Sequence, residues 1–188
     1  MIFNILLFDD FTALDAFGPV EVLSGIPGSE LRFVSLEGGP VSNHQNVSVM
    51  TEKLSDGMLG DTWLIPGGMG TRPLAKDEAF LTELKKIAEA SDYFLTVCTG
   101  SALLARTGLL DGRPATSNHR AAEWVRSCGP KADWQIEDRR WVRSGKYFTA
   151  AGVSAGIDMA LAFVREICGK DTARGIASRM EYRWDEDL

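Results

Sequence analysis

The chain has few of the residues that build metal sites, disulfide frameworks and nucleic-acid surfaces. It contains three widely spaced cysteines and two histidines among 188 residues. An odd number of distant cysteines argues against a disulfide framework and suits a reducing compartment. No paired Cys/His spacing indicates a metal site, so none is expected. The formal net charge is −6 and no basic tract occurs, so we expect no nucleic-acid partner.

Long apolar runs are also missing. The apolar run Ile2–Phe8 is too short to span a membrane. It has no basic lead-in and continues directly into Asp9 and Asp10, unlike a secretory signal. We therefore expect a cytoplasmic protein with no membrane partner. Because 45% of the 188 residues are apolar, residues 1–188 are predicted to form one sizeable domain.

The order of the apolar segments is typical of an α/β fold. Ile2–Phe8 is almost continuously apolar, as a buried parallel strand should be, and Glu78–Ala90 has the single apolar face of an amphipathic helix. Further strands are predicted at Leu31–Leu36, Val47–Val49, Thr62–Ile65, Tyr93–Val97, Pro114–Ser117, Arg140–Val142 and Tyr147–Thr149. Further helices are predicted at Leu14–Leu23, after Cys98, and at Ala121–Arg126, Ser154–Cys168 and Asp171–Met180. Pro19 is expected to start, end or kink the first helix.

Residues Tyr93–Leu104 have the pattern of a strand, a tight turn at Cys98 and a helix. Thr96 and Gly100 lie two positions on either side of Cys98, which is the spacing of small residues in a nucleophile elbow. Such a turn exposes the sulfur and directs the Thr99 N–H and a helix N-terminus toward it. A helix N-terminus favours a thiolate, which predicts a lowered pKa for Cys98. A free cysteine is often simply buried, but this context favours a nucleophile.

Other candidate residues have weaker signals. Asp15 falls just past the carboxyl end of the first strand, where open α/β sheets bind ligands, although helix capping or solvation accounts for it equally well. The Gly-rich loop Pro66–Gly70 lacks a phosphate-binding pattern. It either supplies a backbone N–H to an oxyanion or is a plain turn. His44 is predicted in an exposed loop, and Cys128 and Cys168 are expected to be bystander thiols.

Five segments, taken in order, resemble the ThiJ/PfpI superfamily within the class I glutamine amidotransferase-like fold. They are Leu14–Pro19 (LDAFGP), Ile65–Gly68 (IPGG), Val97–Ser101 (VCTGS), Gly108–Arg113 (GLLDGR) and Gly152–Asp158 (GVSAGID). The resemblance covers nearly the whole chain and looks most like the isonitrile hydratase branch, whose features the sensory domains of some AraC-type regulators share. It implies a single-domain, flavodoxin-like three-layer sandwich with a mostly parallel central sheet and a nucleophile elbow. It also implies a homodimer and no cofactor.

The resemblance gives four residues a role. Cys98 would be the nucleophile, and Asp15 would be the neighbouring general acid and base. Gly68 and Thr99 would lend backbone N–H groups to developing negative charge. A carboxyl that exchanges acid and base roles needs a pKa near the working pH. Like charge from an adjacent thiolate is expected to raise the pKa of Asp15 in that direction.

One departure from the superfamily bears on the chemistry. Many relatives have a histidine near the elbow, but here Asn118 stands in that position and His119 is expected to point elsewhere. A Cys–Asp pair remains, which implies an enzyme that hydrates isonitriles, as small-molecule substrates, to N-substituted formamides. The alternatives are a non-catalytic ligand or oxidative-stress sensor that uses Cys98, and a glyoxalase, deglycase or amidase. Direct gene regulation is not expected, since the chain shows no helix-turn-helix before its acidic end at 185–187.

Overall fold

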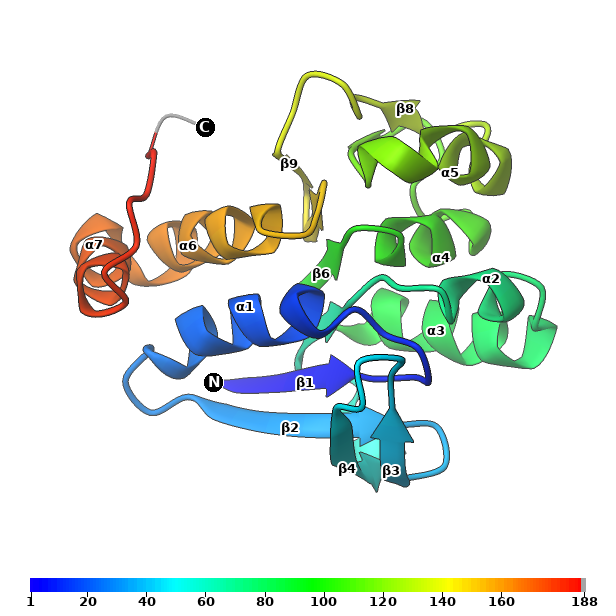
Figure 1. Cartoon of the computed structure of the whole chain (residues 1–188), viewed down its shortest axis with the longest axis horizontal. Coiled ribbons are helices and arrows are strands. Elements are labelled where there is room, and N and C mark those ends of the chain that lie inside the picture. Colours follow the sequence, from blue (N-terminus) through cyan, green and yellow to red (C-terminus); the bar gives the residue numbers. More distant parts are fainter. Residues whose placement is uncertain (187–188) are drawn as a thin grey trace.

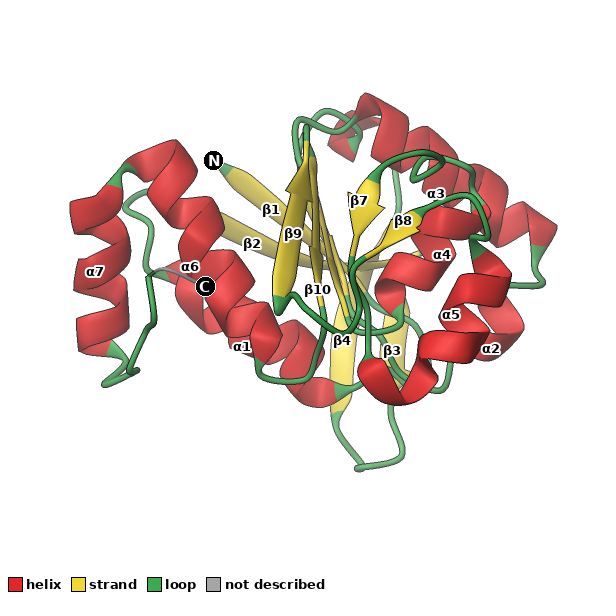
Figure 2. Cartoon of the chain, turned by 90° about the horizontal axis from the view of Figure 1, so that it is seen from above, coloured by secondary structure: helices red, strands yellow, loops and turns green. Residues whose placement is uncertain are grey.

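An eight-stranded sheet with helices on both faces organises the chain, which the computed structural model describes over residues 1–186 (Figures 1 and 2). Asp187, the last residue of the predicted acidic end, and Leu188 lie outside the described residues. The strands of this sheet are β1 (Ile2–Leu6), β2 (Glu30–Ser35), β3 (Gly39–Ser42), β4 (Ser48–Lys53), β5 (Thr62–Ile65), β6 (Phe94–Val97), β9 (Trp141–Ser144) and β10 (Tyr147–Ala150). A separate pair is formed by β7 (Pro114–Ala115) and β8 (Asp133–Trp134).

Seven helices and two 3₁₀ turns, at Asp56–Met58 and His119–Ala121, are found within residues 1–186. The helices are α1 (Ala13–Ser24), α2 (Thr71–Leu74), α3 (Glu78–Ala90), α4 (Gly100–Arg106), α5 (Ala122–Cys128), α6 (Ala155–Cys168) and α7 (Lys170–Arg179). One layer holds α1, α6 and α7, and the other holds α2 to α5 (Figure 2). Over the part of the chain described, none of these helices combines the length and apolar character needed to cross a membrane.

The strand order places the carboxyl ends of β1, β5 and β6 side by side. The order is β3-β4-β2-β1-β5-β6-β10-β9, and the six inner strands run parallel, whereas β3 and β9 pair antiparallel at the edges. The chain moves from β1 to β2 on one side and later returns to place β5 on the other side of β1. Such a switch point forms a crevice at the carboxyl ends of the strands, where α/β folds bind ligands. The predicted fold class is confirmed.

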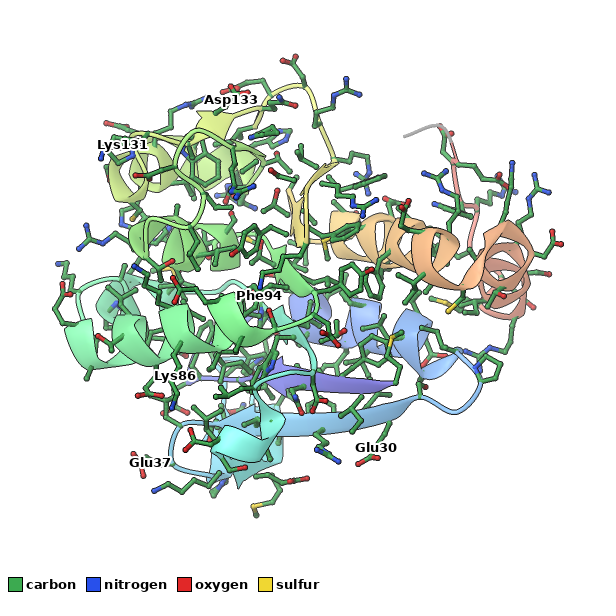
Figure 3. The ribbon with its side chains drawn as sticks, turned by 180° about the vertical axis from the view of Figure 1, so that it is seen from behind. Glu30, Glu37, Lys86, Phe94, Lys131 and Asp133 are labelled. Atoms are coloured by element: carbon green, nitrogen blue, oxygen red, sulfur yellow. The ribbon has the colours of Figure 1, made fainter. Side chains whose placement is uncertain are left out.

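Aromatic side chains join the sheet to the layer that contains α6. The Phe163 ring of α6 packs edge-on against Phe148, with ring centroids 5.3 Å apart, and against Tyr93 at 5.2 Å. Edge-to-face aromatic pairs of this kind add stability beyond their buried area. Figure 3 shows Phe94 among the inner side chains, and the other side chains that it labels are exposed: Glu30, Glu37, Lys86, Lys131 and Asp133.

The first helix differs from the prediction in one respect. α1 runs through Pro19 instead of starting or ending there. Proline lacks the N–H that would bond the carbonyl of Asp15, so packing must offset that loss. α1 packs on α6, and the two helices approach closely at Gly18, where a Cβ would lie 2.9 Å from Ile157 Cγ1. This contact holds α1, which carries Asp15, close against α6.

Candidate active site

The turn at Cys98 has the strained geometry of a nucleophile elbow. β6 ends at Val97, Cys98 has a positive φ of 56°, and α4 begins at Gly100. The Cys98 N–H donates to the carbonyl of Ala150 at 2.9 Å, which ties the turn to the end of β10. A non-glycine residue in this conformation is uncommon and is held there by its surroundings. The predicted strand–turn–helix context is therefore present.

Glycines from two other loops allow the chain to close around Cys98. A Cβ on Gly67, which follows β5, would lie 2.8 Å from Cys98 Cβ, and a Cβ on Gly152 would lie 2.7 Å from the same atom. Both distances are shorter than real Cβ contacts. As a result the sulfur lies among three loops, and Cys98 is only 7% exposed.

Asp15 is completely buried behind the elbow. Its Oδ2 accepts the Gly67 N–H at 3.1 Å, whereas Oδ1 has no hydrogen-bond partner among residues 1–186. Burial raises the pKa of the Asp15 carboxyl to about 7, against the smaller lowering effects of the Gly67 N–H and of the Cys98 thiol. The direction agrees with the prediction, but the main cause is burial and not like charge. Burial therefore lets this carboxyl hold a proton at a much higher pH than an exposed aspartate does.

The thiol behaves differently from the prediction. Burial, reinforced by the negative charge of Asp15, raises the pKa of the Cys98 thiol to about 12, while the Thr99 N–H and hydroxyl lower it by less. The expected lowering by a helix N-terminus is thus wrong, because α4 is only seven residues long and desolvation outweighs its field. The resting site therefore contains a neutral thiol, and a thiolate can form only if a base takes its proton.

Two threonine hydroxyls form a hydrogen-bonded chain that starts beside the sulfur at Thr99. The Gly68 N–H donates to Thr99 Oγ1 at 3.1 Å, and Thr71 Oγ1 lies 2.7 Å from the Gly68 carbonyl and 3.1 Å from Thr99 Oγ1. Arg72 Nη1 donates to Thr71 Oγ1 at 3.0 Å. In this structure the Gly68 N–H is therefore already bonded to a hydroxyl, whereas the Thr99 N–H interacts with the sulfur. The Gly67 N–H, which donates to the carboxyl of Asp15, was not among the predicted site groups.

A cavity of about 430 Å³ opens in front of Cys98. Its walls are formed by Thr12, His44, Gly68, Met69, Arg72, Cys98, Thr99, Asn118, Arg120, Ala121 and Val153. Asn118 lines the cavity and His119 is not among its walls, as the sequence predicted. Asp15 is not among them either, so the carboxyl approaches the sulfur from the protein side. This volume is within the range of small-molecule sites, roughly 300–1,000 Å³.

His44 is exposed, as predicted, but it also lines this cavity, which sequence analysis missed. The β3–β4 hairpin that carries it is fixed to the loop after β1. The Asp10 N–H donates to the Ser42 carbonyl at 2.9 Å, and Asn43 Nδ2 donates to the Phe11 carbonyl at 3.1 Å. No local sequence signal indicates this docking, because it depends on contacts between segments more than thirty residues apart.

Several known proteins resemble this chain in sequence or in structure. A model of the DJ-1/PfpI family matches residues 3–166. Isonitrile hydratase of Pseudomonas putida is 34% identical over 178 residues, which cover 94% of this chain and 76% of that protein. The HTH-type transcriptional regulator GbdR of Pseudomonas aeruginosa is 26% identical over 94% of this chain but only 49% of the regulator. A solved ThiJ/PfpI family protein from Pseudomonas syringae superposes with a TM-score of 0.87 at 26% identity, covering 98% of this chain and 76% of that one.

Proposed function

This chain belongs to the DJ-1/PfpI family, and from that premise we propose that it is a cofactor-free hydratase that converts isonitriles to N-substituted formamides. Cys98 is the nucleophile and Asp15 is the general acid and base. The observation that carries the proposal is the buried Asp15 carboxyl, whose pKa of about 7 lets one group both accept and donate a proton at neutral pH. The similarity to an isonitrile hydratase over 94% of the chain adds support.

The first half of the reaction uses the carboxylate as a base. Ionised Asp15 takes the thiol proton as the sulfur of Cys98 attacks the electrophilic isonitrile carbon, forming a carbon–sulfur bond. Negative charge develops on that carbon, and the protonated carboxyl of Asp15 returns the proton to it. The product of this half is a thioimidate on Cys98, and Asp15 is again ionised. The raised pKa of the thiol makes this concerted transfer necessary, since little thiolate exists beforehand.

The second half adds water to the thioimidate. Asp15 takes a proton from water as the oxygen bonds to the carbon, and this proton passes to the nitrogen of the former isonitrile. The resulting tetrahedral intermediate collapses by breaking the carbon–sulfur bond. The sulfur leaves with the hydroxyl proton, which restores the thiol and releases the N-substituted formamide. The Thr99 N–H and hydroxyl, which stabilise negative charge on the sulfur, assist this departure.

A Cys–His mechanism, as in an amidase, glyoxalase or deglycase, has less support. Among residues 1–186, neither histidine hydrogen-bonds to Cys98, and Asn118 takes the wall position near the elbow. A purely oxidative sensor is also less well supported, because susceptibility to oxidation follows thiolate character and exposure. Cys98 is nearly buried and its pKa is raised.

Turnover by the purified protein tests the proposal. Isonitriles, methylglyoxal and peptide amides are offered separately, and the products are identified, with Cys98→Ala as the blank. We expect formamide production from isonitriles by the wild type and none by the variant. No turnover of any isonitrile, together with peroxide reactivity of Cys98 that increases in Asp15→Asn, would reject the hydratase in favour of the sensor.

A further inference from the structure

We infer that the substrate carries an anionic group, such as a carboxylate, that Arg72 and Arg120 bind from the walls of the cavity that Cys98 also lines. The inference rests on the proposed function, because it names the class of isonitrile that the site accepts. The walls of the cavity contain two arginines and His44 but, within residues 1–186, no aspartate or glutamate. The chain as a whole has a net charge of −6, so this local excess of positive charge is not a general property of its surface.

Arg72 is held in a fixed orientation without an acidic partner. Its Nη1 donates to Thr71 Oγ1 at 3.0 Å, and its guanidinium carbon lies 3.7 Å from the ring centroid of Trp124. Stacking on an aromatic ring orients a guanidinium and leaves its edge free for hydrogen bonds. The side chain is partly buried, yet no ion pair to a carboxylate forms within the described part of the chain. A positioned, partly desolvated cation of this kind is suited to an anion supplied by a ligand.

Two further basic side chains come from other elements. Arg120 lies in the 3₁₀ turn His119–Ala121, is exposed, and like Arg72 is absent from the ion pairs of residues 1–186. His44 comes from the β3–β4 hairpin, which is held against the loop after β1 by hydrogen bonds. Three separate segments therefore bring hydrogen-bond donors to one cavity, and an anionic group inside it would be attracted from several directions.

The arginines do not serve the sulfur itself. Among the described residues, Asp15 is the charged side chain that affects the pKa of Cys98, and neither arginine contributes. Arg72 and Arg120 line the same cavity as Cys98 without being charge partners of the thiol. A substrate bound there would place its isonitrile carbon at Cys98 and its anionic group at the arginines. The volume of about 430 Å³ leaves room for a ring between the two groups.

Matched substrates test this assignment. Initial rates give kcat/KM for para-isocyanobenzoate and for its neutral methyl ester, with wild type, Arg72→Gln, Arg120→Gln and the control Lys85→Gln, an exposed cation outside the cavity walls. We expect the wild type to prefer the carboxylate by about tenfold or more, as a charge-assisted hydrogen bond provides. The preference should fall in both arginine variants and stay unchanged in Lys85→Gln. Equal use of both substrates, or a preference for the ester, by the wild type overturns the inference.

A second measurement does not depend on hydratase activity. 4-(Iodoacetamido)benzoate and its neutral methyl ester both alkylate Cys98, with formation of a carbon–sulfur bond and release of iodide. They differ in charge at the far side of a benzene ring, as the two isonitrile substrates do. Mass spectrometry of the Cys98 peptide gives the ratio of their rates, which is compared with the ratio for glutathione. A ratio shifted toward the carboxylate reagent in wild type, and reduced in Arg72→Gln, supports the anion site even if no isonitrile is hydrated. A ratio equal to that of glutathione rejects the site even if neutral isonitriles are hydrated.

Discussion

Asp15→Asn removes a buried carboxyl whose ionisation opposes folding above its pKa. Asparagine has nearly the same shape and can still accept the Gly67 N–H that Oδ2 accepts at 3.1 Å. The pKa of Asp15 rises from the ordinary 3.8 to about 7 in the fold, so the folded protein binds this proton more tightly than the unfolded chain does. The stability associated with the protonated carboxyl is therefore complete below pH 3.8 and is lost as the pH rises through about 7.

The size of the effect follows from that difference in pKa. At about 1.36 kcal/mol for each pH unit, the wild type loses about 4 kcal/mol of unfolding free energy across the whole range. Roughly 2.5 kcal/mol of this loss lies between about pH 5 and about pH 8. The variant has no carboxyl at this position and does not share the loss. Its free energy of unfolding should therefore increase relative to that of the wild type as the pH rises.

Urea unfolding, followed by tryptophan fluorescence at equal protein concentrations, gives the free energy of unfolding of both proteins at the two pH values. The quantity to compare is the difference between wild type and variant, because the other titrating groups cancel in it. A difference that stays constant from about pH 5 to about pH 8 would refute the argument that burial raises the pKa of Asp15.

The same pair of proteins tests the chemistry. Since Asp15 acts first as a base, kcat/KM of the wild type should rise through about pH 7 and then level off. Asp15→Asn should lack this rise and should lower kcat by about 10²–10⁴-fold. If the stability difference follows pH as expected but the variant keeps its kcat, Asp15 is buried as described but is not the general acid and base.

Three further changes probe the surroundings of the sulfur. Thiolate absorbance at about 240 nm should show that the pKa of Cys98 is above the free-cysteine value of about 8.5. The pKa should be lower in Asp15→Asn, where the opposing charge is gone. A wild-type pKa at or below that of free cysteine contradicts the burial argument. His119→Ala should keep turnover within roughly tenfold of wild type, and a loss of about a thousandfold in a folded variant would restore a histidine base. Thr99→Val should lower the unfolding free energy by about 1–3 kcal/mol, since the Gly68 N–H loses its acceptor; Thr99→Ser should retain most of it, and equal losses in the two variants would count against that bond.

Much of the fold follows from local patterns. The continuously apolar run at Ile2–Phe8 predicted a buried parallel strand, and β1 occupies Ile2–Leu6 in the middle of the sheet. The apolar face of Glu78–Ala90 predicted α3 with the same boundaries. Periods of two and 3.6 residues are local properties of the chain, so they are visible without the tertiary structure. The hairpin strand β3 and the short helix α2 were not predicted, because β3 starts with Gly39 and Pro40 and α2 contains Pro73, residue types that indicate turns.

The sequence by itself also determined where the reactive cysteine lies. The turn at Cys98 requires small residues at Thr96 and Gly100, and that spacing can be recognised in the sequence. The acid–base properties of the site depended on the tertiary structure instead. The pKa values of Asp15 and Cys98 result from burial by segments distant in sequence, and burial reversed the shift expected for the thiol.

The walls of the cavity were likewise decided only in three dimensions. His44 reaches it because a hairpin docks on the loop after β1, and Arg72 is oriented by Thr71 and by the Trp124 ring, fifty-two residues away. Local spacing determines which residues form a strand, turn or helix. Desolvation and the approach of distant side chains are sums over the whole fold, so no segment read alone contains them.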